Sequence, residues 1–115
     1  MIKVYGIPNC DTVKKARAWL AEREVPHEFH DFKKQGVPEP RLPHWAAQVG
    51  LEKLVNRKGT TWRQLDPAVQ AGLTDEASAH SLMARHASVI KRPVVEWSNG
   101  DVTVGFSPDD WAERG

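Results

Sequence analysis

In the first thirty or so residues, the pattern of apolar and polar positions predicts a strand, then a helix, then a second strand. Residues 2–5 are β-branched or aromatic around one lysine, and the glycine, proline and asparagine among residues 6–9 end this run, which predicts a strand. Over residues 11–23 apolar side chains recur at helical spacing, with lysine and arginine on the other face. Residues 28–32 alternate polar with apolar side chains, which is typical of a half-buried strand. We therefore expect two parallel strands joined by a helix through a right-handed crossover.

The middle of the chain carries a different pattern. Between Gly36 and Ser88 no convincing strand pattern occurs, so we expect helices to fill this segment. The predicted helices are one from Pro40 or Pro43 to Gly50, a short turn opened by Asp66 and Pro67, and one from residues 74–76 to about His86, with Ala79, Leu82, Met83 and His86 facing inward.

Strand patterns return near the end of the chain. Residues 93–97 and 102–104 are rich in β-branched side chains, and the Ser-Asn-Gly-Asp run at 98–101 predicts the turn of a β-hairpin between them. A proline then predicts a last short helix over residues 108–111, with Ser107 as its N-cap. This order of strands and helices places the chain in the α/β class.

Length and charge limit the classes of function. A chain of 115 residues makes one ordinary domain. Its 16 Lys and Arg residues nearly balance 15 Asp and Glu residues, so the net charge of +1 creates no field that would recruit nucleic acid or an anionic membrane. The N-terminus has no signal-peptide core, and no apolar run approaches the roughly 20 residues of a membrane span. We expect a cytoplasmic monomer that binds neither nucleic acid nor a membrane directly.

The single cysteine, Cys10, is the first candidate for chemistry. One cysteine excludes an intramolecular disulfide and a cysteine-based zinc cluster. Cys10 falls in the loop between the first strand and the first helix, where unpaired helix amides favour a thiolate and can lower a thiol pKa from about 8.5 to roughly 3.5–7.5. Lys14 lies one turn further along the same helix face. A buried, inert thiol is the alternative.

Two arginines are candidates for binding an anion beside Cys10. Arg57 and Arg92 each lie beside a lysine at the boundary of a predicted element, and planar guanidinium groups bind oxyanions and carboxylates in a bidentate manner. Solvated surface is the alternative for such basic pairs. Pro93 makes the preceding peptide bond a candidate for the cis form, which would fix the loop beside Cys10. Asn9 and Thr12 are expected to orient the cysteine loop.

Histidine and tryptophan positions add no further site. The five histidines show no metal-ligand spacing, so no metal is predicted. The five tryptophans are spread along the chain without a cluster beside basic residues, which indicates core packing rather than a base-stacking platform.

Three segments together carry a resemblance to a known family. Residues 5–17 around Cys10, 56–62 around Arg57 and 90–93 around Arg92 resemble the ArsC/Spx family, and most closely its YffB-type members, over nearly the whole chain. The resemblance implies a thioredoxin-like fold, with β-α-β and β-β-α halves around a mixed sheet. It also implies one domain over residues 1–115, with a helical insertion at about 36–89.

The resemblance also implies a chemistry. In the arsenate reductases of this family a cysteine attacks the oxyanion, arginines bind it, and glutathione or glutaredoxin resolves the product; Cys10, Arg57 and Arg92 match these positions. A further oxyanion-binding arginine of the family falls near Gly105 and Phe106, where this chain has none. Losing one charge-assisted contact of roughly 1.5–3 kcal/mol would weaken anion binding more than tenfold, which argues against arsenate as the substrate.

The predicted function is that of a glutathione-dependent thiol oxidoreductase resembling arsenate reductase. Cys10 would attack a disulfide or a small oxyanion, and glutathione or glutaredoxin would regenerate it, with no bound cofactor. The alternative is a non-enzymatic regulator that binds the RNA polymerase α subunit, as the Spx branch does. That branch senses oxidation through a Cys-x-x-Cys pair, and here Val13 stands at the second position. A small module that captures glutathione-like anions is a third possibility.

Overall fold

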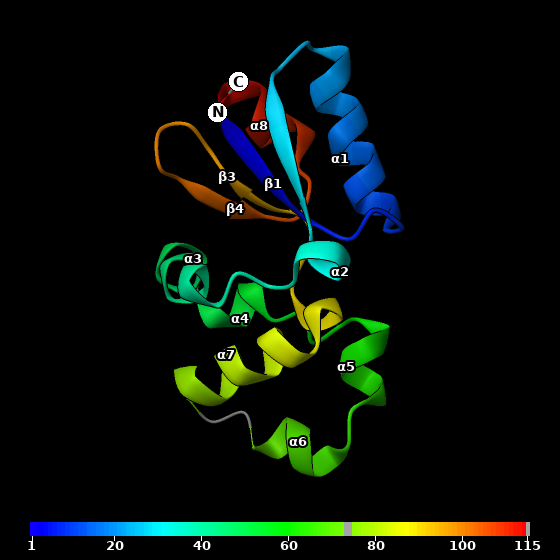
Figure 1. The fold of residues 1–115 in the computed structure, drawn as a ribbon, viewed down its shortest axis with the longest axis vertical. Coiled ribbons are helices and arrows are strands. Elements are labelled where there is room, and N and C mark those ends of the chain that lie inside the picture. Colours follow the sequence, from blue (N-terminus) through cyan, green and yellow to red (C-terminus); the bar gives the residue numbers. More distant parts are fainter. Residues whose placement is uncertain (73–74, 115) are drawn as a thin grey trace. The chain divides into compact units, whose positions relative to one another are not determined.

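The computed structural model describes residues 1–72 and 75–114, which contacts divide into two compact units (Figure 1). The first comprises Met1–Gln35 and Arg92–Gly115, and the second comprises Gly36–Lys91. No helix among the described residues has the length and apolar character needed to cross a bilayer. That the chain acts as one domain stays a prediction.

The first unit is built on a mixed sheet. Its strands, among the described residues, are β1 (Ile2–Gly6), β2 (His27–Asp31), β3 (Val94–Glu96) and β4 (Val102–Val104), in the order β2-β1-β3-β4. β1 runs parallel to β2 and antiparallel to β3, and β3 pairs antiparallel with β4. This arrangement confirms the predicted β-α-β and β-β-α halves.

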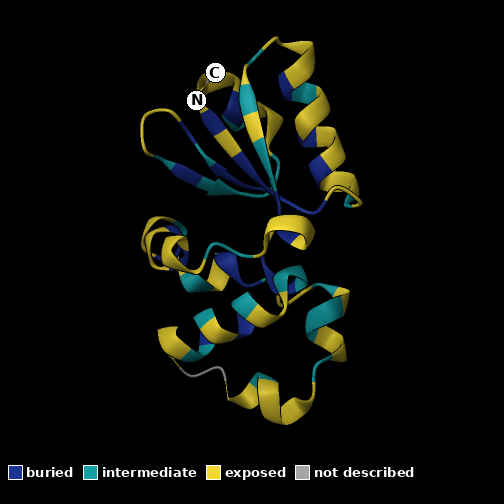
Figure 2. Ribbon diagram, viewed as in Figure 1, coloured by how far each residue is buried: buried dark blue, intermediate teal, exposed yellow. Residues whose placement is uncertain are grey.

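Two helices pack on one face of this sheet. α1 (Asp11–Glu22) follows β1, and α8 (Pro108–Arg114) follows β4. Figure 2 shows buried positions recurring along α1, whose other face is exposed. The buried cluster between sheet and helices consists of Ile2, Val4, Ala16, Leu20, Val95, Trp97 and Trp111. Aromatic rings meet edge-on here, with Trp111 centred 5.2 Å from Trp97 and 4.8 Å from Phe106, a geometry that aromatic pairs favour.

The second strand is shifted from its predicted range of residues 28–32. It ends at Asp31, and Phe32 begins the short helix α2 (Phe32–Gln35). The Asp31 carboxylate accepts the Lys33 backbone N–H at 2.8 Å, so a local turn replaces the next step of the sheet ladder. Phe32 is buried and stacks on Tyr5. The prediction of a strand through residue 32 was therefore wrong at its end.

The second unit consists almost entirely of short helices. These are η1 (Glu39–Arg41), α3 (Leu42–Val49), α4 (Leu51–Leu54), α5 (Thr60–Gln64), α6 (Pro67–Ala71), α7 (Glu76–Arg85) and η2 (Ala87–Val89). Gly50 ends α3 with a φ of 86°, and an isolated bridge joins Val55 to Ile90. The predicted helices in this segment are confirmed, whereas α4 and α5 had no distinct signal in the sequence.

The helix α7 has a strong N-cap and an abrupt end. Asp75 accepts the Ser78 backbone N–H at 2.8 Å, and the Ser78 hydroxyl receives the Asp75 N–H in return. Thr74, part of the predicted start, lies outside the described residues. Ala79, Leu82 and Met83 are buried, as the helical spacing predicts. The inward placement of His86 was wrong, because the helix ends at Arg85 and His86 is exposed.

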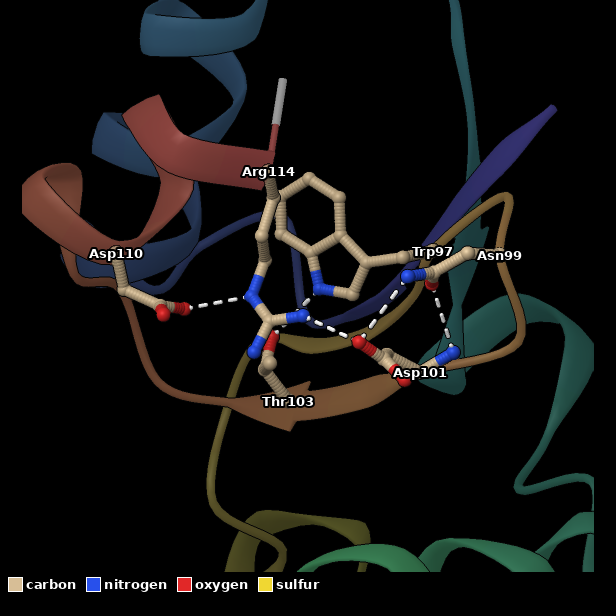
Figure 3. Close-up of polar contacts among 6 residues, drawn as sticks. All are labelled: Trp97, Asn99, Asp101, Thr103, Asp110 and Arg114. Atoms are coloured by element: carbon tan, nitrogen blue, oxygen red, sulfur yellow. Dashed lines mark hydrogen bonds and ion pairs between the residues drawn. The ribbon is translucent and has the colours of Figure 1, made fainter.

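The C-terminal helix is tied to the β3–β4 turn by a polar cluster (Figure 3). The Arg114 guanidinium binds Asp101 at 2.7 Å and Asp110 at 2.8 Å, and it lies over the Trp97 ring. Asn99 accepts the Asp101 backbone N–H at 3.0 Å, which orders the turn. The helix predicted from Pro108 is confirmed and extends to Arg114.

Asp101→Asn is expected to lower the unfolding midpoint slightly at neutral pH, because it removes the charge that binds Arg114. Hydrogen bonds from Arg114 and Asn99 hold the pKa of Asp101 below its usual range. A depressed carboxyl pKa contributes stability above the unfolded pKa of about 3.9 and loses it as pH falls through the folded value. Thermal unfolding at several pH values should show the difference between the two proteins shrinking in acid; a constant difference would contradict this.

Candidate active site around Cys10

Cys10 occupies the position immediately before α1. It is the N-cap residue, with extended backbone angles of φ −93° and ψ 126°. Its N–H donates to the Ile7 carbonyl at 3.2 Å, and its carbonyl accepts the Lys14 N–H at 2.9 Å. The side chain is half-buried and the thiol is free. The predicted place in the loop between the first strand and the first helix is confirmed.

The surroundings of the thiol favour its ionised form. Burial raises the pKa of Cys10, but the backbone hydrogen bond from Val13, the hydrogen bond and positive charge of Arg92, and the backbone of Thr12 outweigh it. The pKa therefore lies below its ordinary value. Helix-start amides and a guanidinium are the groups that stabilise thiolates in proteins.

Arg92 acts on Cys10 from the segment just before β3. It is half-buried, and the bond from it to the buried Pro93 is cis. The Pro93 carbonyl accepts the backbone N–H of Gly105 at 2.9 Å. This hydrogen bond ties the residue after Arg92 to the residue that follows β4. Sequence spacing gave no sign of this backbone pairing, because it joins residues from two different strand ends.

Three further predicted site residues of the first unit lie in or next to the loop that carries Cys10. Thr12 contributes a backbone hydrogen bond to the thiol, and Asn9 is exposed in the turn before Cys10. The Lys14 backbone contacts Cys10, but its exposed ammonium is not among the groups that shift the thiol pKa within the described part of the chain. A role for Lys14 in substrate binding stays a prediction.

Arg57 belongs to the second unit. It is exposed, and its guanidinium lies 5.6 Å from the centre of the Trp62 ring. The backbone N–H of the preceding residue, Asn56, donates to the Val89 carbonyl at 2.6 Å, which fixes the base of the arginine loop. Convergence of Arg57 with Cys10 stays a prediction.

At the position where the resemblance places a further oxyanion-binding arginine, this chain has Gly105 and Phe106, and both have structural roles. Gly105 has a φ of 78°, in the left-handed region that favours glycine. Phe106 packs against Trp111 and Trp19, whose ring centroids lie 4.8 Å and 6.4 Å away. Backbone conformation and aromatic packing thus account for the residues found here.

Gly105→Arg is expected to destabilise the protein by about 1–3 kcal/mol, because a side chain at a left-handed position carries that cost. Urea unfolding followed by circular dichroism measures the change. Gly105→Ala is the matched control, since it adds a β-carbon without a charge. Equal losses for both would assign the cost to the backbone, and an unchanged Gly105→Ala protein would contradict the explanation.

The arrangement around Cys10 can perform nucleophilic chemistry at one sulfur. A half-buried thiol with a lowered pKa at a helix start, beside a guanidinium that can bind an anionic group, has the two features needed to attack an electrophile carrying negative charge. With a single cysteine in the chain, a second thiol must come from another molecule.

Comparisons with known proteins agree with this description. The family model described as the ArsC family matches residues 5–114. The solved YffB protein is 47% identical, with a TM-score of 0.93 and coverage of 99% of this chain and 98% of the other. An arsenate reductase related protein from Brucella melitensis is 43% identical, with a TM-score of 0.74 and coverage of 97% and 92%. The global transcriptional regulator Spx of Streptococcus pyogenes is 25% identical, with coverage of 96% and 81%. The fold is thioredoxin-like, and the chain belongs to the ArsC family.

Proposed function

We propose that this protein is a thiol oxidoreductase in which Cys10 supplies the single nucleophilic thiolate and glutathione is the co-substrate. The observation that carries the proposal is the joint action of the Val13 amide and the Arg92 side chain on the thiol, which lowers the pKa of Cys10 below its ordinary value. Its similarity to an arsenate reductase related protein supports redox chemistry at this cysteine.

The reaction proceeds by two exchanges. The Cys10 thiolate attacks one sulfur of a disulfide, so that a bond forms between Cys10 and that sulfur while the other sulfur leaves as a thiolate. Glutathione thiolate then attacks the substrate sulfur of this mixed disulfide, which releases the Cys10 thiolate and a disulfide of glutathione. Arg92, with Arg57 and Lys14, would hold a carboxylate of the substrate or of glutathione. A small oxyanion is the second substrate class, with glutaredoxin as the alternative reductant.

The rate of Cys10 alkylation by iodoacetamide against pH is the first test. Mass spectrometry confirms the modified residue. A midpoint well below about 8.5 is the expected result, because it would show an activated thiolate. A midpoint at or above that value would overturn the proposal. The second test is turnover of the mixed disulfide of glutathione and mercaptoethanol, followed through glutathione reductase and NADPH.

Similarity to the Spx regulator supports a second candidate function, binding of the RNA polymerase α subunit without catalysis. Val13 is fully buried at the position of the second family cysteine, so any redox control would require another molecule. A pull-down with the C-terminal domain of the α subunit tests this candidate. Failure to bind at micromolar concentration, together with turnover of the disulfide, would reject it.

A further inference from the structure

The end of β1 approaches the start of α1 unusually closely at Gly6. A methyl group built at Gly6 would lie 2.8 Å from Cγ2 of Val13 and 3.6 Å from Cγ1. Carbon atoms in contact normally lie about 3.5–4.0 Å apart, so any side chain at Gly6 would force Val13 or the backbone to move. Gly6 also pairs with Asp31 in the sheet, which holds it in place.

The Val13 side chain has little room to move away from such a methyl group. It is fully buried in α1, and a valine in a helix strongly prefers one χ1 rotamer. Relief of the contact therefore requires a shift of the first turn of α1 relative to β1. That turn and the adjoining loop are connected to Cys10 through the bond from its N–H to Ile7 and the bond from Lys14 to its carbonyl.

We propose that Gly6 is a positioning residue for Cys10: the absence of a side chain lets Val13 pack against β1, and this contact sets the first turn of α1 against the sulfur. The proposal rests on the proposed function, because it concerns the reactivity of the same thiol. Val13 thus has two roles, since its side chain meets Gly6 while its backbone N–H acts on the thiol.

The test compares Gly6→Ala, Val13→Ala and the double variant by the pH dependence of Cys10 alkylation. Gly6→Ala is expected to raise the midpoint and slow alkylation at neutral pH several-fold. Val13→Ala removes the contact with β1 and should also raise the midpoint. The double variant should return toward the wild-type midpoint, because the β-carbons at positions 6 and 13 would then lie 3.8 Å apart, at ordinary contact distance. Arg92, the charged group that acts on the thiol, and the charged residues of the first turn of α1, Asp11 and Lys14, stay unchanged in all three proteins.

A merely structural role would give a different result. Gly100→Ala is the matched control, because Gly100 has a φ of 95° in the β3–β4 turn and its substitution strains the backbone without meeting any neighbour. It should lower the unfolding midpoint while the alkylation midpoint stays at the wild-type value. A wild-type alkylation midpoint in Gly6→Ala, or a raised one in the double variant, would overturn the inference. An ordinary midpoint in the unmodified protein would instead overturn the proposed function.

Discussion

Cys10→Ser is expected to reduce turnover of the glutathione mixed disulfide to the background rate. Serine keeps the size of the side chain, but its hydroxyl is not ionised at neutral pH and cannot form the mixed disulfide. Below the folded pKa of Cys10, where the thiol is protonated, the substitution should change the unfolding midpoint little, because Cys10 is half-buried and outside the buried cluster of the first unit. The coupled NADPH assay measures turnover, and circular dichroism measures unfolding.

The difference in stability between the wild type and Cys10→Ser is expected to depend on pH. The pKa of Cys10 in the folded protein lies below its ordinary value, so the folded state loses its proton before the unfolded state does. The wild type therefore gains stability relative to Cys10→Ser as pH rises from the folded pKa to the unfolded value of about 8.5, and loses this advantage as pH falls through the folded pKa. Full activity in Cys10→Ser, or a stability difference independent of pH, would contradict an ionised nucleophile at this position.

Local sequence patterns were sufficient to predict much of the fold of the first unit. Helical spacing over residues 11–23 predicted α1, because a helix with one buried face has apolar residues at regular intervals. The polar turn residues at 98–101 predicted the β3–β4 hairpin, because such short turns have a characteristic composition. The start of α1 also predicted that its amides would favour a Cys10 thiolate, and the contact from Val13 agrees.

Other features depend on contacts between elements. The bond from Gly105 to Pro93 forms only when β3 and β4 pair, and Gly6 meets Val13 only when α1 packs on β1, so neither has a local pattern. The end of β2 was misplaced for a related reason. Phe32 continues the apolar alternation, yet the Asp31 carboxylate binds the backbone two residues on and begins α2.

Arg92→Ala is expected to raise the midpoint of Cys10 alkylation and to lower kcat/KM for the mixed disulfide more than tenfold. Arg92 acts on the thiol both as a hydrogen-bond partner and as a positive charge. A hydrogen bond to a charged group contributes about 1.5–3 kcal/mol, and about 1.4 kcal/mol corresponds to a factor of ten. Arg92→Lys keeps the charge without the planar guanidinium, so its midpoint should lie between those of the wild type and Arg92→Ala.

Lys14→Ala is the matched control for Arg92, because it removes one cation from the same unit at a residue whose ammonium does not act on the thiol. Its alkylation midpoint should equal that of the wild type. A midpoint raised as far as in Arg92→Ala would mean that general positive charge, rather than the guanidinium next to Cys10, favours the thiolate. If kcat/KM falls in Lys14→Ala while its midpoint stays unchanged, Lys14 binds the substrate and Arg92 activates the nucleophile. The two cations would then act at different steps of the same reaction.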